Sequence, residues 1–329
     1  MNRRFVGKAL GAALAAPLLS LAAGRARAQA DKPLTIVVPY GPGGTTDMLG
    51  RLIAQHLAAP LGRTVLVENR PGAGSALGAA HVARAAPDGN TLLVATSSTL
   101  AINPSLYAKL PYDPLKDFAP IGMIASVPLA LVVHPSVEAR NVAELLAAAK
   151  RRPGGLSFGS AGNGTPQHLA AEIFKAATGA DLRHVPYGGS AAALNDVLGG
   201  QLDLMFVDLA PALAHAQGQR LRVLGVTSLA RQQTLPDVPT IAESGVSELA
   251  QFEVIAWQSL VAPAGTSGEV VARLSQLLIQ MIDRPDVRER LQREGVEPRS
   301  GSPEQLAATI RADTGRWAKI IKAARISVG

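Results

Sequence analysis

The segment from Thr35 to Asp47 constrains the fold more than any other part of the chain. Residues 35–38 favour a buried strand, whereas the Gly-Pro-Gly-Gly of residues 41–44 cannot continue it. After Asp47, residues 48–57 have the apolar spacing of an amphipathic helix. The segment therefore predicts a strand, a glycine turn and a helix start. The unpaired N–H groups of such a start carry about half a positive charge and suit a carboxylate or phosphate.

A similar pattern returns later in the chain. Residues 185–190, Val-Pro-Tyr-Gly-Gly-Ser, repeat the Val-Pro-Tyr-Gly of residues 38–41 and precede a helical pattern at 191–198. Another glycine turn precedes Thr165, which suits a helix N-cap because Pro166 occupies the first helical position. The repetition predicts two lobes that face a shared cleft.

Strand and helix patterns alternate along most of the chain. Strand patterns at 64–69 and 91–96 are followed by turns, and a second set of strands begins near residue 129. This alternation predicts an α/β fold in which each lobe is a mainly parallel sheet flanked by helices. Ligands bind such sheets outside the carboxyl ends of the strands. Residues 97–99, with 103–104, are expected to form a polar loop at one such end.

The predicted elements also suggest where the lobes divide. We place the boundary near Ser126, so that residues 29–126 plus 256–329 form lobe 1 and residues 127–255 form lobe 2. A strand at 257–263 should lead back to lobe 1, which gives the lobes two connections. Amphipathic helices are expected at 267–283, 285–295 and 303–324, and they should pack on lobe 1.

Residues 1–28 have the features of an export signal. A basic start is followed by an apolar run at 9–23 and by small residues suited to cleavage, after either Ala28 or Ala30. The pair Arg3-Arg4 leaves the Sec and twin-arginine routes both open. The segment predicts an exported protein.

Removal of this segment changes the charge of the chain. Its formal net charge is +7, and residues 1–28 hold five basic residues and no acid, so the mature chain has 7 − 5 = +2. A nearly neutral chain without a basic run argues against nucleic acid as a partner. Cysteine is absent and the six histidines are dispersed, so we expect no metal site and no cofactor.

The ordered set of motifs resembles one family. The motifs are Val-Pro-Tyr-Gly-Pro-Gly-Gly at 38–44, Val-Glu-Asn-Arg-Pro-Gly-Ala-Gly at 67–74, Gly-Thr-Pro-Gln-His-Leu at 164–169, Val-Pro-Tyr-Gly-Gly at 185–189 and Leu-Pro-Asp-Val-Pro-Thr at 235–240. In this order they are similar to the substrate-binding receptors of tripartite tricarboxylate transporters, the Bug family. One departure is Phe206-Val207-Asp208, since the acid more often follows the phenylalanine directly.

The resemblance implies a two-lobed periplasmic binding protein of type II-like fold that is not an enzyme. It implies capture of a small carboxylate, such as a dicarboxylate, an acidic amino acid or an aromatic acid. It also implies a monomer that delivers its ligand to the membrane subunits of such a transporter or to a sensor kinase.

The candidate ligand-binding residues belong to the turns that end the strands. Their backbone N–H groups and hydroxyls could donate to a carboxylate. For Asp208, pairing with a ligand amine and bracing of nearby loop amides are both open. The full set is Tyr40, Gly41, Gly43, Gly44, Thr45, Thr96, Ser97, Ser160, Ala161, Gly164, Thr165, Tyr187, Gly188, Gly189 and Asp208.

Two other functions compete with this interpretation. Gly155-Leu156-Ser157-Phe158-Gly159 fits the nucleophile pattern of a serine hydrolase, with Asp208 and His215 following in an acceptable order. However, Ser157 lies at the start of a predicted strand rather than after one. A sugar receptor on the same fold is the second alternative, but aromatic residues are only 4% of the chain, which disfavours stacking on sugar rings.

Overall fold

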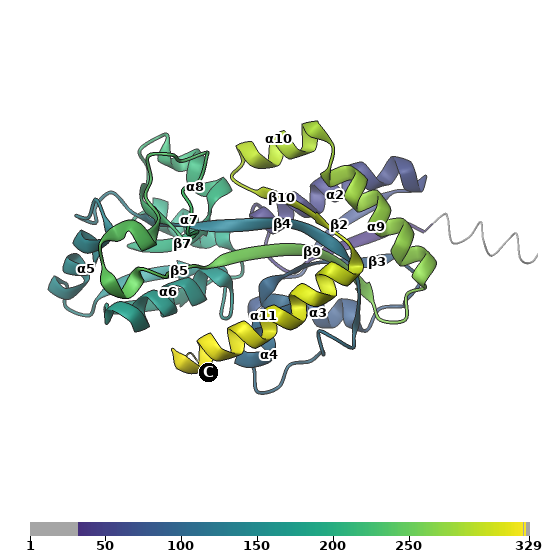
Figure 1. Cartoon of the computed structure of the whole chain (residues 1–329), viewed down its shortest axis with the longest axis horizontal. Coiled ribbons are helices and arrows are strands. Elements are labelled where there is room, and N and C mark those ends of the chain that lie inside the picture. Colours follow the sequence, from purple (N-terminus) through teal and green to yellow (C-terminus); the bar gives the residue numbers. More distant parts are fainter. Residues whose placement is uncertain (1–31, 325, 327–329) are drawn as a thin grey trace, which may run out of the picture.

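The computed structural model describes residues 32–324 and residue 326, so the predicted export signal lies outside the described residues. The elements gather in two groups that are joined by the long strands β4 (Phe118–Val133) and β9 (Ile255–Pro263) (Figure 1). This arrangement confirms the predicted two-lobed α/β fold.

One half contains the first strands of the chain. Parallel pairing joins β2 (Val65–Asn69) to β1 (Leu34–Val38) and β1 to β3 (Thr91–Thr96), and β9 then runs antiparallel to β3. The side chains of Leu34, Ile36 and Val38 pack with one face of the helix that follows β1. The strand predicted at 35–38 is therefore confirmed, and its covered faces explain its apolar sequence.

The other half contains the second set of strands. Parallel pairing joins β5 (Leu156–Ser160) to both β6 (Leu182–Pro186) and β7 (Leu204–Asp208). Strand β8 (Arg222–Val226) pairs antiparallel with β4. The parallel pairs place the carboxyl ends of β5, β6 and β7 at one edge of the sheet.

Strand β4 connects the two halves. It pairs with β9 from Phe118 to Pro128, and from Leu129 onward it pairs with β7 and β8. The sequence analysis placed a strand only from residue 129, so the first part of β4 was missed. That part contains Pro120 and Gly122, where the register shifts, and such bulges obscure a strand pattern. The exact lobe boundaries stay a prediction.

Helices flank both parts of the sheet. The helices are α2 (Thr45–Leu61), α3 (Ala76–Ala83), α4 (Asn103–Leu106), α5 (Val142–Arg151), α6 (Pro166–Thr178), α7 (Ser190–Leu198), α8 (Leu209–Ala216), α9 (Gly268–Ile282), α10 (Pro285–Arg293) and α11 (Pro303–Ala323), with short turns η1 (Ala73–Ser75), η2 (Ser98–Ile102), η3 (Ile241–Ser244) and η4 (Ser247–Leu249). Among the described helices, none is long and apolar enough to cross a bilayer.

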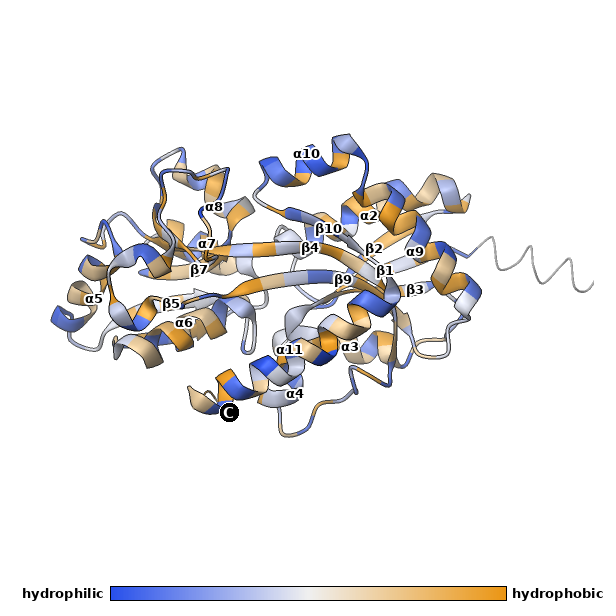
Figure 2. Ribbon diagram, viewed as in Figure 1, coloured by the Kyte–Doolittle hydropathy of each residue, from blue (hydrophilic) through white to orange (hydrophobic). Residues whose placement is uncertain are grey.

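The three C-terminal helices are confirmed, and they pack on the half that contains β1. Helix α9 contacts α2 and β4, while α11 contacts η2, α4 and β4. In Figure 2, α10 is mainly hydrophilic, in keeping with its peripheral place, whereas β4 is hydrophobic over much of its length. Strand β10 (Glu297–Gly301), which pairs with β4, was not predicted.

One predicted loop is wrong. The residues after Ser97 form a π-helix, η2, which continues into α4 at Asn103. Ser97, Ser98 and Thr99 are fully buried rather than solvated. The cause is packing of Leu100 and Ile102 in the core beneath α11, which carries their polar neighbours inward.

Helix α11 is anchored by Trp317, which is fully buried in the same core. We predict that Trp317→Ala lowers the free energy of unfolding by about 3–5 kcal/mol, because it leaves a large cavity. Urea unfolding measures this change, and Lys319→Ala on the exposed face of α11 is the control. A loss equal to that of the control would show that α11 does not contribute to the core as described.

Candidate functional site

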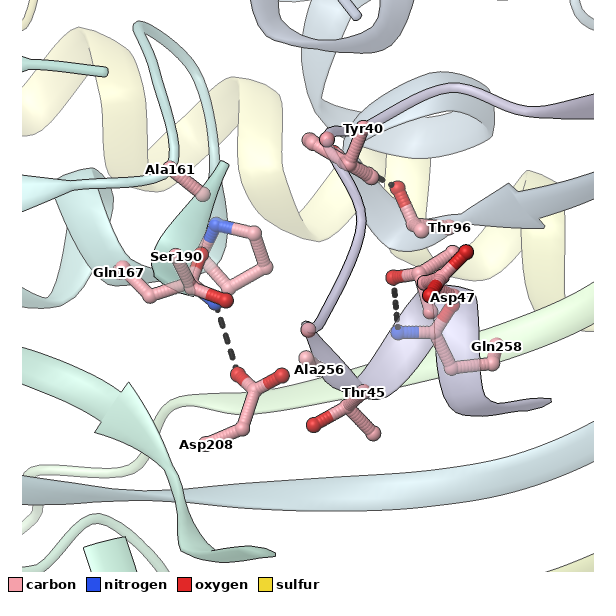
Figure 3. Close-up of a pocket in the computed structure, with 14 residues that line it drawn as sticks. Tyr40, Thr45, Asp47, Thr96, Ala161, Gln167, Ser190, Asp208, Ala256 and Gln258 are labelled. Atoms are coloured by element: carbon pink, nitrogen blue, oxygen red, sulfur yellow. Dashed lines mark hydrogen bonds between the residues drawn. The ribbon is translucent and has the colours of Figure 1, made fainter. Parts of the chain in front are cut away.

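A buried cavity of about 30 Å³ lies where the two halves meet. It is lined by the turn after β1, the first residues of α2, α6 and α7, the end of β7, and β9 (Figure 3). Of the predicted site residues, it brings together Tyr40, Gly41, Gly44, Thr45, Thr96, Ala161 and Asp208.

Three helices begin at this cavity. At α2 and α7 the N-cap positions are Gly44 and Gly189, and neither provides a side-chain cap. At α6, by contrast, Thr165 Oγ1 accepts from the N–H of His168. Helices α2 and α7 therefore leave first-turn N–H groups free of side-chain caps, and the dipoles of both helices favour an anion there.

Asp47 lies in the first turn of α2, yet its carboxylate is already occupied. Its oxygens accept from Gly43 N–H at 3.1 Å, Arg51 Nε at 2.9 Å and Asn69 Nδ2 at 2.9 Å. Burial opposes its charge, but these hydrogen bonds and the Arg51 charge hold the pKa of Asp47 below its usual value. Asp47 thus braces the glycine turn, and sequence reasoning did not assign it this role.

Several polar side chains around the cavity are buried. The hydroxyls of Tyr40 and Thr96 lie 3.2 Å apart, and burial raises the pKa of Tyr40, so it stays a neutral donor. Gln258 Nε2 donates to Thr46 Oγ1 at 3.2 Å. Thr45 Oγ1 has no hydrogen-bond partner of regular geometry among the described residues. The Thr45 hydroxyl nevertheless acts on Asp208, where burial raises the pKa of the acid and this hydroxyl opposes the shift, so a ligand would compete with the Asp208 carboxylate for this donor.

Asp208 ends β7 with its side chain directed at the cavity (Figure 3). Its Oδ1 accepts from Gln167 Nε2 at 2.7 Å. Burial raises the pKa of Asp208, while the Thr45 hydroxyl and the Gln167 amide oppose that shift. The described hydrogen bonds give Asp208 a side-chain partner and no loop amide, so the bracing role considered from the sequence has no support.

The other predicted site residues line no part of this cavity. Tyr187 and Gly188 line a neighbouring cavity of about 140 Å³, with Tyr40 and Ala161 between the two. Gly43 and Gly189 lie in the turns before α2 and α7. Ser160, Gly164 and Thr165 make hydrogen bonds to nearby residues, and Ser97 is fully buried. As ligand contacts, all predicted residues remain predictions.

Sequence reasoning missed four further polar residues of the cavity. Two of these had a signal in the sequence: Gln167 follows the Thr165-Pro166 helix start, and Gln258 is polar within the apolar strand β9. A polar residue inside a buried strand has to be satisfied, so it points to a site. The other two, Thr46 and Ser190, belong to the predicted turns at 41–46 and 187–190, although they are not in the set of expected ligand contacts.

The two Val-Pro-Tyr-Gly turns touch one another. Gly41 N–H donates to the carbonyl of Gly188 at 3.0 Å. A Cβ at Gly189 would lie 3.1 Å from Gly41 N, which is tighter than ordinary contact. The close approach therefore depends on glycine, and the cavity is closed on this side by backbone from both halves.

The serine of the hydrolase pattern is not placed for catalysis. Ser157 Oγ donates to Asp203 Oδ2 at 2.8 Å, and its N–H donates to the same oxygen. Asp203 also pairs with Arg152. Within the described residues, no hydrogen bond joins Ser157 to His215 or Asp208, so the triad has no geometric support.

Two histidines support the turn before α6. His168 and His184 stack with ring centres 4.1 Å apart, and Phe158 stacks on His184 at 4.8 Å. His184 Nε2 lies 2.6 Å from Ser160 Oγ, and His168 Nδ1 accepts from Gly164 N–H at 3.2 Å. Burial, with nearby positive groups, lowers the pKa of His168 to about 3 and of His184 to about 4.

This pair should make stability depend on pH. The unfolded chain binds protons on both histidines below about pH 6.5, whereas the folded protein does not until about pH 3–4. We therefore predict that the free energy of unfolding falls as pH falls from about 6.5 to about 4. Urea midpoints across this range should fall less steeply in the double variant His168→Gln/His184→Gln. If the slope is unchanged in this variant, the two histidines do not cause the pH dependence. His81→Gln, on the surface of α3, is the control.

Comparison with known proteins identifies relatives over nearly the whole chain. The model of the tripartite tricarboxylate transporter family receptor matches residues 49–326. Protein BugT of Bordetella pertussis (strain Tohama I) is 35% identical over 292 residues, covering 88% of this chain and 89% of BugT. These findings confirm the resemblance drawn from the motifs.

Solved structures give the same result. The structure of Rpa4515 of R. palustris with adipate is 36% identical, with a TM-score of 0.86, and covers 90% of this chain and 98% of that one. The structure of MatC (Rpa3494) from Rhodopseudomonas palustris with bound malate is 32% identical, with a TM-score of 0.83. The match covers 88% of this chain and 98% of MatC.

Proposed function

Because the chain belongs to the tripartite tricarboxylate transporter receptor family, we propose that it is a periplasmic receptor that captures a small carboxylate. The relatives are solute-binding receptors, not enzymes. The ligand classes we consider are dicarboxylates, acidic amino acids and aromatic acids. Relatives with adipate and malate bound support the first of these classes, the dicarboxylates.

The main structural support for carboxylate binding is that the helices α2 and α7 both begin, without side-chain caps, at one cavity between the halves. Their N–H groups and the Thr45 hydroxyl would donate to the ligand carboxylate. Hydrogen bonds to a charged group contribute about 1.5–3 kcal/mol each, so several reach micromolar affinity after the costs of ordering.

Closure of the two lobes would trap the ligand. The lobes are linked by β4 and β9, while the turns at Gly41 and Gly188 meet on the opposite side of the cavity. A bend in the linking strands would separate these turns and admit the ligand. The closed form would then be presented to the membrane subunits of a transporter or to a sensor kinase. Export by the Sec or twin-arginine route belongs to the same proposal.

The two competing functions have less support. Ser157 is bonded to Asp203, and the relatives are receptors, which leaves the hydrolase without a basis. For the sugar receptor, Tyr40 is the one aromatic side chain among the described residues that line the cavity, and its hydroxyl is engaged by Thr96. Sugar receptors bind their ligands largely by stacking on such rings.

Thermal unfolding of the exported, processed protein tests the proposal. The panel comprises dicarboxylates, acidic amino acids, aromatic acids and neutral sugars. An acid at about 100 times its dissociation constant contributes about 2.7 kcal/mol, which raises the melting temperature by several degrees. A saturable rise with one acid is expected. A response to sugars alone would contradict the proposal.

Substitution at Gly44 tests the place of binding. A Cβ there would lie 2.9 Å from Ser190 Oγ, across the cavity, while φ is −92° and permits any residue. We predict that Gly44→Val leaves the fold stable but weakens binding of the responding acid by at least about 100-fold, because the two helix starts cannot approach. Gly268→Val, where a Cβ meets nothing within 4 Å, is the control. Equal affinity of the two variants in calorimetry would place the ligand elsewhere.

A further inference from the structure

Asp208 is a buried acid whose charge has no cationic partner in the described part of the chain. Its exposed fraction is 4%, and no described Lys, Arg or His forms an ion pair with it. Gln167 provides a neutral hydrogen bond, and the Thr45 hydroxyl lies nearby without regular hydrogen-bond geometry. A buried charge without a counter-charge is costly, so a cation supplied by a ligand would stabilise the ionised carboxylate at this position.

Local structure does not account for the acid. Asp208 occupies the N-cap position of α8, yet its side chain makes no capping hydrogen bond there. It points instead across the cavity toward Thr45, at the start of α2 (Figure 3). Asp47, the other acid of the cavity, differs because Arg51 and Asn69 satisfy it. Asp208 is thus the one acid among the described lining residues that has no cationic side chain beside it.

The cavity therefore combines opposite requirements. The uncapped starts of α2 and α7 favour a negative group, while Asp208 at the end of β7 favours a positive one. A plain diacid could place one carboxylate at the helix starts, but its second carboxylate would then lie beside Asp208 with no cationic side chain among the described lining residues. An acid with an ammonium group matches both ends, because each charge meets its complement inside the cavity.

Resting on the proposed function, we propose that the ligand class is an amino acid, with its carboxylate at the helix starts and its ammonium group against Asp208. Asp208 would then determine specificity, since it distinguishes an amino acid from the acid that lacks the amine. The Gln167 amide would hold the Asp208 carboxylate in position for this contact.

Matched pairs of acids test the proposal by calorimetry with the processed protein. The pairs are L-aspartate with succinate and L-glutamate with glutarate, and L-malate replaces the ammonium of aspartate by a hydroxyl. We expect an amino acid to bind at least about 10-fold more tightly than its amine-free partner. Asp208→Asn keeps the shape of the side chain but removes its charge. It should weaken the affinity for the amino acid by about 30-fold or more, while the affinity for the amine-free acid stays the same or increases.

The control is Asp237→Asn, which removes an exposed acid of the same half and should leave both affinities unchanged. The amino-acid proposal would be overturned if succinate, glutarate or malate bound as tightly as the matching amino acid and Asp208→Asn did not change the ratio of the two affinities. The protein would then still be a carboxylate receptor. Failure of every acid in the wider thermal panel would overturn the receptor function and this proposal with it.

Discussion

The antiparallel pairing of β4 with β9 is the constraint on which the rest of the structure depends. The two strands run together from Phe118–Pro263 to Pro128–Ile255 and then join different partners. Each half of the molecule builds its own parallel strands onto this shared pair, so the carboxyl ends of both sets face one gap. The same pair is the only strand link that a hinge motion has to bend, among the residues described.

Under the proposed function, backbone N–H groups of the cavity rather than charged side chains attract the anion. Glycine at the N-caps of α2 and α7 keeps the first-turn N–H groups accessible, and the absence of a side-chain cap leaves them without a competing acceptor. Backbone N–H donors bind a carboxylate but do not distinguish between the groups to which it is attached. Under the proposed function, selectivity would therefore come from side chains that line the cavity, such as Asp208, Gln167 and Gln258.

The sequence predicted the parts of this arrangement that local chemistry determines. The turn at residues 41–44 and the helix start at Thr165 follow from glycine, proline and capping preferences, and both occur as predicted. The polar loop after Ser97 was wrong because tertiary packing buried its hydroxyls. Likewise, the partner of Asp208 could not be predicted, because Gln167 reaches it from another element, and the early part of β4 was hidden by its bulges.

A crystal structure of the processed protein with the acid that stabilises it most would show whether the carboxylate binds between the two halves. One carboxylate should lie between the starts of α2 and α7, with its oxygens about 2.7–3.2 Å from backbone N–H groups of both helices. The turns at Gly41 and Gly188 should be in contact around it. An acid bound outside this cavity, or held by the residues of one half alone, would contradict the account.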